Sequence, residues 1–387
     1  MNPINDAPAF ATGSGIVITS VSPGYDDGYG IALQADGKIV AVGDSYNGSS
    51  FEFAVVRYNT NGTLDTSFGG GDGVVTTDIG AGSDYGLSVA LQADNKIIVV
   101  GASHNGSNND LTLNRYNSDG TLDTSFGGGD GIVTTDLGGN ERGVSLTLQS
   151  DGKIVVTGTS ENGGNVDIAL LRYNSDGTLD TSFGGGDGIV TTAVGTGNDY
   201  SADVTLQADG KIVVAGTSDN SGNTDFTLLR FYSDGTLDTS FGGGDGIVTT
   251  DLGSTSGGSV ALALQADGKI VVMGESNSNF ALARYTNDGT LDTSFGGGDG
   301  FVTTLVEAGW NDAYNGTLQA DGKILIVGSS SNGSDDNIAV VRYNNDGTLD
   351  TSFGGGDGIV TTDAVPGESY GYGSGIAVQA DGKIAVA

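Results

Sequence analysis

The sequence predicts an all-β fold, a seven-bladed β-propeller whose seventh blade is incomplete. One observation is an internal repeat, because the lysines at positions 38, 96, 153, 211, 269, 323 and 383 stand 58, 57, 58, 58, 54 and 60 residues apart. Another is that each unit contains short runs rich in β-branched residues, bounded by Gly, Asn and Asp. No stretch shows the period of an amphipathic helix. A unit of this length suits a four-stranded propeller blade.

The order of elements within a unit is clearest at residues 204–253. Four runs, VTLQ, KIVVAG, FTLLRF and IVTT, have the composition of strands. Asp209-Gly210 predicts a tight hairpin between the first two runs, because Asp-Gly supplies the positive φ angles of such a turn. The repeat predicts a linker remnant at residues 1–9 and a propeller over 10–387, with units near 24–78, 79–136, 137–193, 194–251, 252–304, 305–363 and 364–387.

The two ends of the chain predict that the last blade is open. The run IVITS at residues 16–20 precedes the first unit, and the last unit stops at residues 383–387 without its third strand. If IVTT is the outer strand of each blade, residues 16–20 complete the seventh blade while one inner strand is missing. The stretch NDAP at residues 5–8 looks like linkers between modules of long bacterial surface proteins. We therefore expect a fragment of a longer chain.

Composition restricts the classes of partner. The chain has 70 Gly and no Cys, so disulfides and thiolate metal sites are excluded. Its 48 acids and 14 bases give a formal charge of −34, which disfavours nucleic acid and anionic membranes as partners. No apolar run approaches the roughly 20 residues of a membrane helix. We expect an extracellular or cell-surface location and a monomer within a longer chain.

Several motifs recur in a fixed order along the chain. The series LQADGKI, a variable loop, FALxRYNxDGTLDTSFG and GIVTT resembles the delta-60 repeat, a family of bacterial β-propellers, over essentially residues 10–387. The order of strands and DG turns is also similar to NHL-type blades. The resemblance implies a propeller within a large secreted or surface protein. It implies no agreed activity and no catalytic residues.

The stretch LDTSFGGGDG occurs six times, first at residues 64–73. It lacks the pattern and the helix of a phosphate-binding loop, so a blade-to-blade turn is the favoured interpretation. Calcium is the alternative, with Asn117, Asp119 and Asp123 as ligands, because oxygens spaced by two can wrap a hard cation. Arg115 stands at the first ligand position and favours Arg–Asp and Lys–Asp ties instead. No other cofactor is expected.

Aromatic residues outside the repeated positions gather in the loops that vary between units. Tyr and Trp combine a flat apolar ring with a polar tip, which suits sugars and protein partners, although packing between blades is the alternative. The residues predicted to bind ligand are Trp310, Tyr29, Tyr46, Tyr85, Tyr200, Tyr314 and Tyr372. Thirteen of the fourteen Lys and Arg occupy repeat positions, and only Arg142 does not.

These observations predict a non-catalytic binding, adhesion or scaffold module that presents variable loops to a glycan or an extracellular protein. No catalytic residues are assigned, because the single His104 lies in a variable loop and the chain has no Cys. One alternative is a carbohydrate-active enzyme, a lyase or glycosidase with carboxylates over a central channel. Another is a structural spacer stabilised by calcium.

Overall fold

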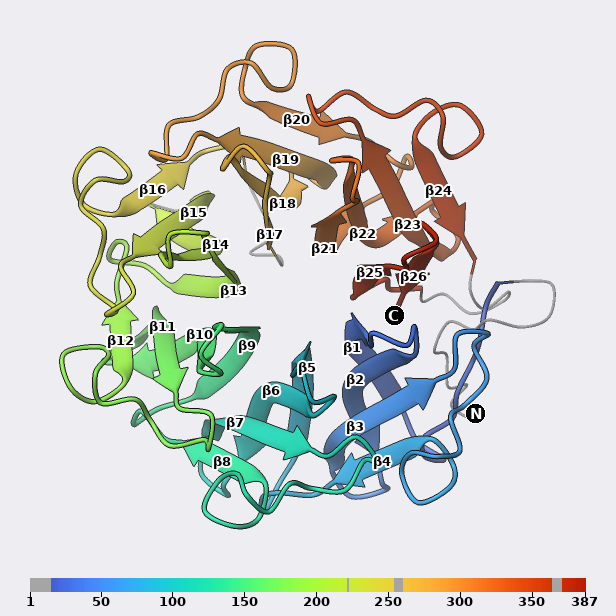
Figure 1. Cartoon of the computed structure of the whole chain (residues 1–387). Helices are drawn as coiled ribbons and strands as arrows, with labels where there is room; N and C mark the ends of the chain where they lie inside the picture. The colour runs from blue at the N-terminus through green and yellow to red at the C-terminus, as the bar shows by residue number, and fades with distance from the viewer. Residues whose placement is uncertain (1–14, 221–222, 254–259, 364–370) are drawn as a thin grey trace. The chain divides into compact units, whose positions relative to one another are not determined.

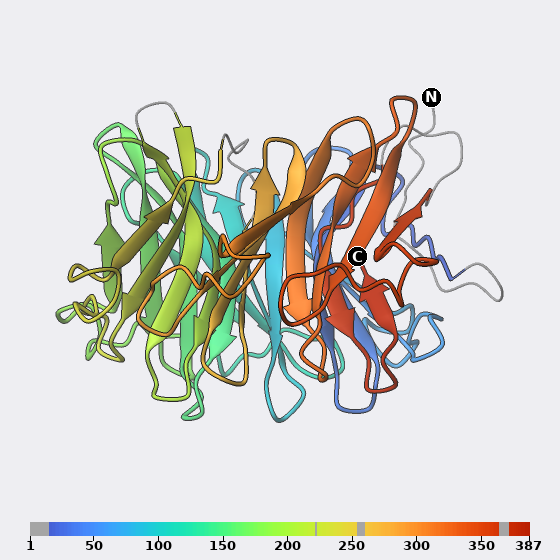
Figure 2. The ribbon, with the colours of Figure 1, turned by 90° about the horizontal axis from the view of Figure 1, so that it is seen from above.

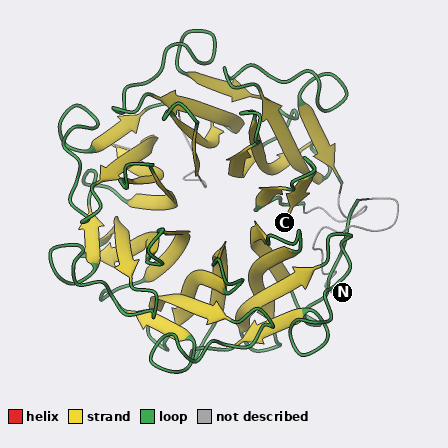
Figure 3. Cartoon of the chain, in the orientation of Figure 1, coloured by secondary structure: helices red, strands yellow, loops and turns green. Residues whose placement is uncertain are grey.

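The computed structural model describes residues 15–220, 223–253, 260–363 and 371–387. Within these residues every regular element is a strand, and no helix is present that could cross a membrane (Figure 3). The chain divides into two compact units, which are described separately. The first takes in the described residues up to 164, with 168–191 and 379–387, and the second takes in 165–167 and 192–378.

The first unit contains three antiparallel four-stranded sheets, here called blades, each a simple meander (Figure 1). The strands are β1 (Asp26–Leu33), β2 (Ile39–Tyr46), β3 (Phe51–Tyr58), β4 (Val74–Thr77), β5 (Asp84–Leu91), β6 (Ile97–His104), β7 (Asn109–Tyr116), β8 (Ile132–Thr135), β9 (Glu141–Leu148), β10 (Ile154–Asn162), β11 (Asn165–Tyr173) and β12 (Ile189–Thr192). Figure 2 gives a second view of these strands.

The second unit contains three further blades of the same meander. Its strands are β13 (Asp199–Leu206), β14 (Ile212–Asn220), β15 (Asn223–Phe231), β16 (Ile247–Thr250), β17 (Ala261–Leu264), β18 (Ile270–Ser276), β19 (Asn279–Tyr285), β20 (Phe301–Thr304), β21 (Asn311–Leu318), β22 (Ile324–Ser331), β23 (Asp336–Tyr343) and β24 (Ile359–Thr362).

The prediction of seven blades is wrong, because the described residues form six. Where we expected the seventh, β25 (Ile376–Val378) and β26 (Ile384–Val386) form only a two-stranded sheet. Within the described residues β25 and β26 pair only with each other. The IVITS run at residues 16–20 forms no strand, although Thr19 accepts a hydrogen bond from Tyr58 at 2.8 Å. Residues 1–9, predicted to be a linker, lie outside the described residues.

The two middle strands of each blade are buried on both faces, which explains their unbroken apolar sequence. In β6 every residue from Ile97 to Ser103 is buried. Side chains of neighbouring blades form one core between them, as where Val100 and Leu111 meet Val156 and Leu171. Hydrogen bonds between blades add to this packing, for example Thr135 with Tyr173 at 2.7 Å.

The first strand of several blades carries a β-bulge that turns one side chain out of the regular alternation. In β1 the pairing with β2 passes from Gly28 directly to Gly30, so Tyr29 is the extra residue. Leu87 in β5 and Tyr314 in β21 take the same position. In the first unit β5 contacts both β1 and β9, so the first strands of three blades lie next to one another (Figure 1).

Candidate functional site

Each of the six blades contains a buried tie between an Arg, an Asp and a Lys. In the second blade Arg115 Nε lies 2.7 Å from Asp123 Oδ2, and Lys96 Nζ lies 3.0 Å from the same oxygen. The guanidinium also stacks over the Phe126 ring at 4.5 Å. Its Nη1 donates to the carbonyl of Ser175 in the next blade. Asp123 is the first Asp of LDTSFGGGDG in this blade. It therefore joins strands within the blade and, through Arg115, joins two blades.

The three residues considered for calcium lie in one turn of the second blade. Asn117 donates to Thr121 Oγ1 at 3.0 Å, and Asp119 accepts from the backbone and hydroxyl of Thr121. Burial alone would raise the pKa of Asp123, but hydrogen bonds from Ser125 and Lys96 and the charge of Arg115 hold it well below its ordinary value. Lys96 and Arg115 thus already form ion pairs with the Asp123 carboxylate. Calcium binding in this turn stays a prediction.

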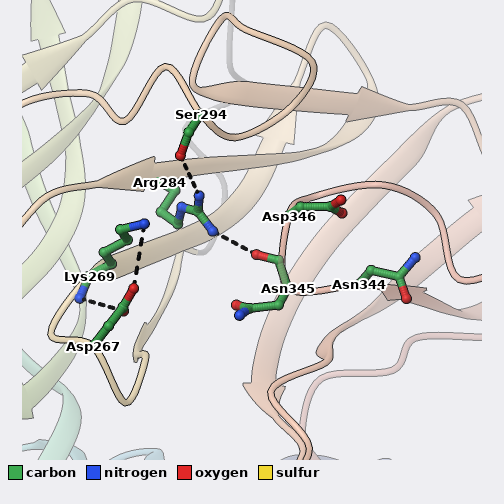
Figure 4. Close-up of a pocket in the computed structure, with 7 residues that line it drawn as sticks. All are labelled: Asp267, Lys269, Arg284, Ser294, Asn344, Asn345 and Asp346. Carbon is green, nitrogen blue, oxygen red and sulfur yellow. Dashed lines mark hydrogen bonds and ion pairs between the residues drawn. The ribbon is translucent and has the colours of Figure 1, made fainter.

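The second unit contains an open depression between two loops (Figure 4). Within it Arg284 donates to Ser294 Oγ at 3.1 Å and to the Asn345 carbonyl at 2.6 Å. Lys269 lies 3.4 Å from Asp267. The residues that line the depression are Asp267, Lys269, Arg284, Ser294, Asn344, Asn345 and Asp346. Arg284 and Lys269 both form ion pairs with Asp292, as their counterparts do in the other blades. We therefore interpret this depression as part of the structural contact between two blades and not as a ligand site.

A different environment surrounds Arg142, the second residue of β9. Of the fourteen Lys and Arg, thirteen form ion pairs with Asp, and Arg142 forms none within the described residues. Its side chain is exposed. In a chain with a formal charge of −34, Arg142 is thus an exposed positive charge outside the repeated Lys and Arg ion pairs.

Asp44 and Tyr29 lie close enough to Arg142 for its charge to lower the pKa of each. Asp44, in β2, is 1 % exposed and pairs across the sheet with Asp27. Burial, and secondarily the charge of Asp27, raises the pKa of Asp44 to about 8, although Arg142 and a hydrogen bond from Tyr29 oppose the rise. Burial and the same carboxylates raise the pKa of Tyr29. A carboxyl group that titrates near neutral pH beside a phenol and an exposed guanidinium has the features of a site for proton transfer.

Three of the predicted ligand residues gather in this part of the first unit. Tyr85 is electrostatically coupled to Tyr29, and its ring centroid lies 5.8 Å from that of Phe51. Phe51 in turn lies 5.2 Å from Tyr46. The structure thus brings Tyr29, Tyr46 and Tyr85 near one another, and the sequence prediction included neither Asp44 nor Arg142 among the ligand residues.

The other predicted ligand residues belong to the second unit. Tyr314 and Tyr372 meet edge to face, with ring centroids 6.2 Å apart, and the Tyr314 hydroxyl lies 3.5 Å from Asp312 Oδ2. Tyr200 in β13 is 41 % exposed. Trp310, half-buried, precedes β21, and its carbonyl accepts from the Ser331 amide at 2.9 Å. The structure brings Tyr314 and Tyr372 together, and their role in binding stays a prediction.

Replacing Asp44 with Asn is expected to change the pH dependence of stability. Folded Asp44 has a pKa of about 8, whereas an unfolded Asp titrates near 4, so between these values the native state binds one proton more. The stability that this group contributes is therefore present at low pH and lost as pH rises through 8. Unfolding in urea at pH 5 and pH 8 should show Asp44→Asn gaining about 2–4 kcal/mol relative to wild type across this window. A constant difference between the two proteins would contradict the assignment.

Comparison with family models identifies the repeat. Six stretches, at residues 34–68, 92–126, 149–183, 207–241, 265–295 and 319–353, match a model described as "Domain of unknown function (DUF5122) beta-propeller", and together they cover just over half of the chain. The chain belongs to the DUF5122 beta-propeller family. The matches support a repeat propeller, as the sequence predicted. Tyr29, Tyr85 and Arg142 fall outside the matched stretches of this DUF5122 chain.

Solved structures with similar folds include lyases. A catalytically inactive virginiamycin B lyase from Staphylococcus aureus with quinupristin has a TM-score of 0.54 and 14% identity, over 93% of this chain and 92% of that one. Its selenomethionine form gives 0.51 and 13%, over 90% and 88%. Polysaccharide lyase Uly1 gives 0.50 and 12%, over 98% and 93%. No curated protein matches the sequence.

These comparisons contradict our prediction that the chain is not an enzyme, because the similar propellers named above are lyases. The predicted absence of catalytic residues rested on the single His104 and the lack of Cys, and that argument did not consider the first strands, where the blades differ. At identities below 15% the likeness establishes the fold alone. The activity of this DUF5122 propeller is therefore argued below from its own residues.

Proposed function

We propose that this protein binds an acidic carbohydrate at Arg142 and cleaves it by β-elimination, the reaction of a polysaccharide lyase. The observation that carries the proposal is the exposed, unpaired guanidinium of Arg142 beside Asp44 and Tyr29. The proposal is a more specific form of one alternative from the sequence analysis, a carbohydrate-active enzyme that uses carboxylates. A glycan partner outside the cell or at its surface is part of the same proposal.

Recognition of an acidic sugar requires a local positive charge, since the protein as a whole repels polyanions. A guanidinium matches the planar carboxylate of a uronic acid with two parallel hydrogen bonds. The rings of Tyr29 and Tyr85 offer flat apolar surfaces beside that charge, and sugar rings pack against such surfaces. Arg142 therefore supplies the charge and the tyrosines supply contact area.

Arg142, Tyr29 and Asp44 each have a role in the proposed β-elimination. In β-elimination the C–H bond next to the sugar carboxylate breaks, a C=C bond forms, and the C–O bond to the leaving sugar breaks. Arg142 stabilises the negative charge that develops on the carboxylate. Above pH 8, where the Asp44 carboxyl is ionised, Tyr29 accepts the sugar proton while its own hydroxyl proton passes to Asp44. The leaving oxygen takes a proton from solvent.

Turnover of a panel of polysaccharides tests this proposal. Full-length protein is incubated with polymers that contain uronic acid and with neutral polymers, and the unsaturated product is followed by its ultraviolet absorbance. Product is expected only from acidic polymers. Arg142→Gln should lower kcat/KM by about 100-fold or more, the effect of losing one preorganised group in other enzymes. Tyr29→Phe should do the same, whereas Tyr232→Phe, an exposed tyrosine of the second unit, should not.

The proposal fails if folded wild-type protein forms no unsaturated product from any uronate polymer. It fails equally if Arg142→Gln retains wild-type turnover. Binding of an acidic polymer without cleavage would keep the carbohydrate site and reject the reaction. The resemblance to delta-60 repeats, a location at the cell surface and a monomeric state within a longer chain accompany this proposal as predictions of their own.

A further inference from the structure

Three carboxylates from different segments of the first unit meet at one point. Asp110 belongs to β7, Asp136 directly follows β8, and Glu141 is the first residue of β9. One carboxylate oxygen of each lies within 4.8 Å of the other two. The loops that carry them are bound together, because Asn108 donates to the Gly139 carbonyl and the Asn109 amide donates to Asn140 Oδ1 at 3.3 Å. The three oxygens are thus held close to one another by the fold.

The negative charge of this group is not neutralised by the protein. None of the three carboxylates forms an ion pair, in contrast to Asp123 and its counterparts. Their hydrogen-bond donors are neutral: Asn105 donates to Asp110 at 2.9 Å, the Gly138 amide to Asp136 at 2.7 Å, and the Gly139 amide to Glu141 at 2.7 Å. Three like charges at this spacing repel one another strongly unless a cation lies among them.

Glu141 provides a second and independent observation. Its side chain is 1 % exposed, and its Oε2 has no hydrogen-bond partner within the described residues. Leaving a buried carboxylate oxygen without a partner is costly, so native structures rarely tolerate it. Asp84 and Asp199 leave one such oxygen at the same strand position, but within the described residues only Glu141 stands with two further carboxylates, where a metal ion would supply the missing partner.

We propose that Asp110, Asp136 and Glu141 bind a calcium ion between the β6–β7 and β8–β9 loops. Calcium takes six to eight oxygen ligands at about 2.3–2.6 Å, so two ligands on opposite sides of the ion stand up to about 5 Å apart. The spacing of 4.8 Å or less fits this limit. Magnesium demands a tighter octahedron at about 2.0–2.1 Å, which suits this spacing less well. The site is separate from the three residues considered from the sequence, and the inference does not depend on the proposed lyase activity.

The corresponding segment of the second unit supplies a matched control. There Ala193 follows β12 where Asp136 follows β8, while Asp167 and Asp199 keep the two other acidic positions. Asn165 donates to the Gly197 carbonyl and the Val166 amide donates to Asn198 Oδ1, as Asn108 and the Asn109 amide donate to Gly139 and Asn140. The two positions therefore share their hydrogen-bonding surroundings and differ in the third carboxylate.

Calorimetric titration of the chelator-treated full chain with calcium chloride tests the proposal, using wild type, Asp136→Asn and Asp167→Asn. Asn at position 136 can still accept from the Gly138 amide, so the loop is expected to fold. Wild type and Asp167→Asn should bind calcium with equal affinity, and Asp136→Asn should bind at least tenfold more weakly. Magnesium should bind more weakly than calcium.

A thermal melt of each protein with calcium or with chelator gives a second readout. Calcium should raise the Tm of wild type and Asp167→Asn but not that of Asp136→Asn. The proposal is overturned if wild type binds no calcium, or if Asp136→Asn binds it as tightly as wild type does. Loss of the response in Asp119→Asn but not in Asp136→Asn would assign the ion to the turn predicted from the sequence.

Discussion

Asp123→Asn should lower the free energy of unfolding by about 3–5 kcal/mol, because it leaves a buried guanidinium without its counter-charge. Arg115 is 5 % exposed, and its Nε and the Lys96 ammonium share the Asp123 Oδ2 atom at 2.7 and 3.0 Å. The amide of Asn carries no charge, so Arg115 loses its counter-ion, while Lys96 keeps only the ion pair with Asp94 at 3.6 Å. The loss should be visible as a shift of the urea unfolding midpoint with little change in slope.

The matched control for this substitution is Asp119→Asn in the same turn. The Asp119 side chain is exposed and accepts from the amide and hydroxyl of Thr121, a role that Asn also fills. Its cost should stay below about 1 kcal/mol. If both substitutions cost the same, the buried tie is not what stabilises the blade, and our structural interpretation of the repeated Asp fails.

Gly127→Ala should destabilise the protein by about 3–5 kcal/mol, through positive φ and steric overlap together. Gly127 is the first of three consecutive glycines in the repeated loop, with a φ of +67°. A Cβ at this position would overlap the backbone carbonyl of Ile132. The same residue donates its amide to the Asp176 carbonyl of the next blade at 3.0 Å, so the loop cannot move away without breaking that contact.

Gly128→Ala separates the cost of the positive φ angle from the cost of steric overlap. Gly128 has a φ of +87°, and a Cβ there would meet nothing within 4 Å. Only the conformational cost of about 1–2 kcal/mol should remain. Unfolding of both variants in urea measures the difference. An equal loss in the two variants would mean that the close approach to Ile132 contributes nothing and that φ alone demands these glycines.

The repeated parts of this chain were predictable because each carries a local signal. Lys96, Arg115 and Asp123 recur at fixed spacing, and the structure joins their counterparts into one tie in every blade. The Asp-Gly turns and the β-branched runs likewise specify hairpins without reference to distant residues. The number of blades carries no such local signal. It depends on whether each strand finds neighbouring strands to pair with, and β25 and β26 pair only with each other within the described residues.

The candidate sites were only partly predictable. Arg142 was visible as the one base outside the repeat, and Tyr29 and Tyr85 as aromatic residues in variable segments. Asp44 was missed because its significance comes from burial and from neighbours on two other strands, β1 and β9, which no spacing reports. Glu141 was missed for the same reason, since its unpartnered oxygen is a property of the folded loops.

The role of Arg142 as the anion-binding group is tested most directly by a binding comparison in the Tyr29→Phe background, where turnover should be suppressed. A uronate oligosaccharide and its carboxyl-reduced form are titrated into the protein with and without Arg142→Gln. We expect the acidic form to bind at least tenfold more tightly than the reduced form, and Arg142→Gln to abolish that preference. Equal affinity for the two sugars in the protein that retains Arg142 would contradict the account.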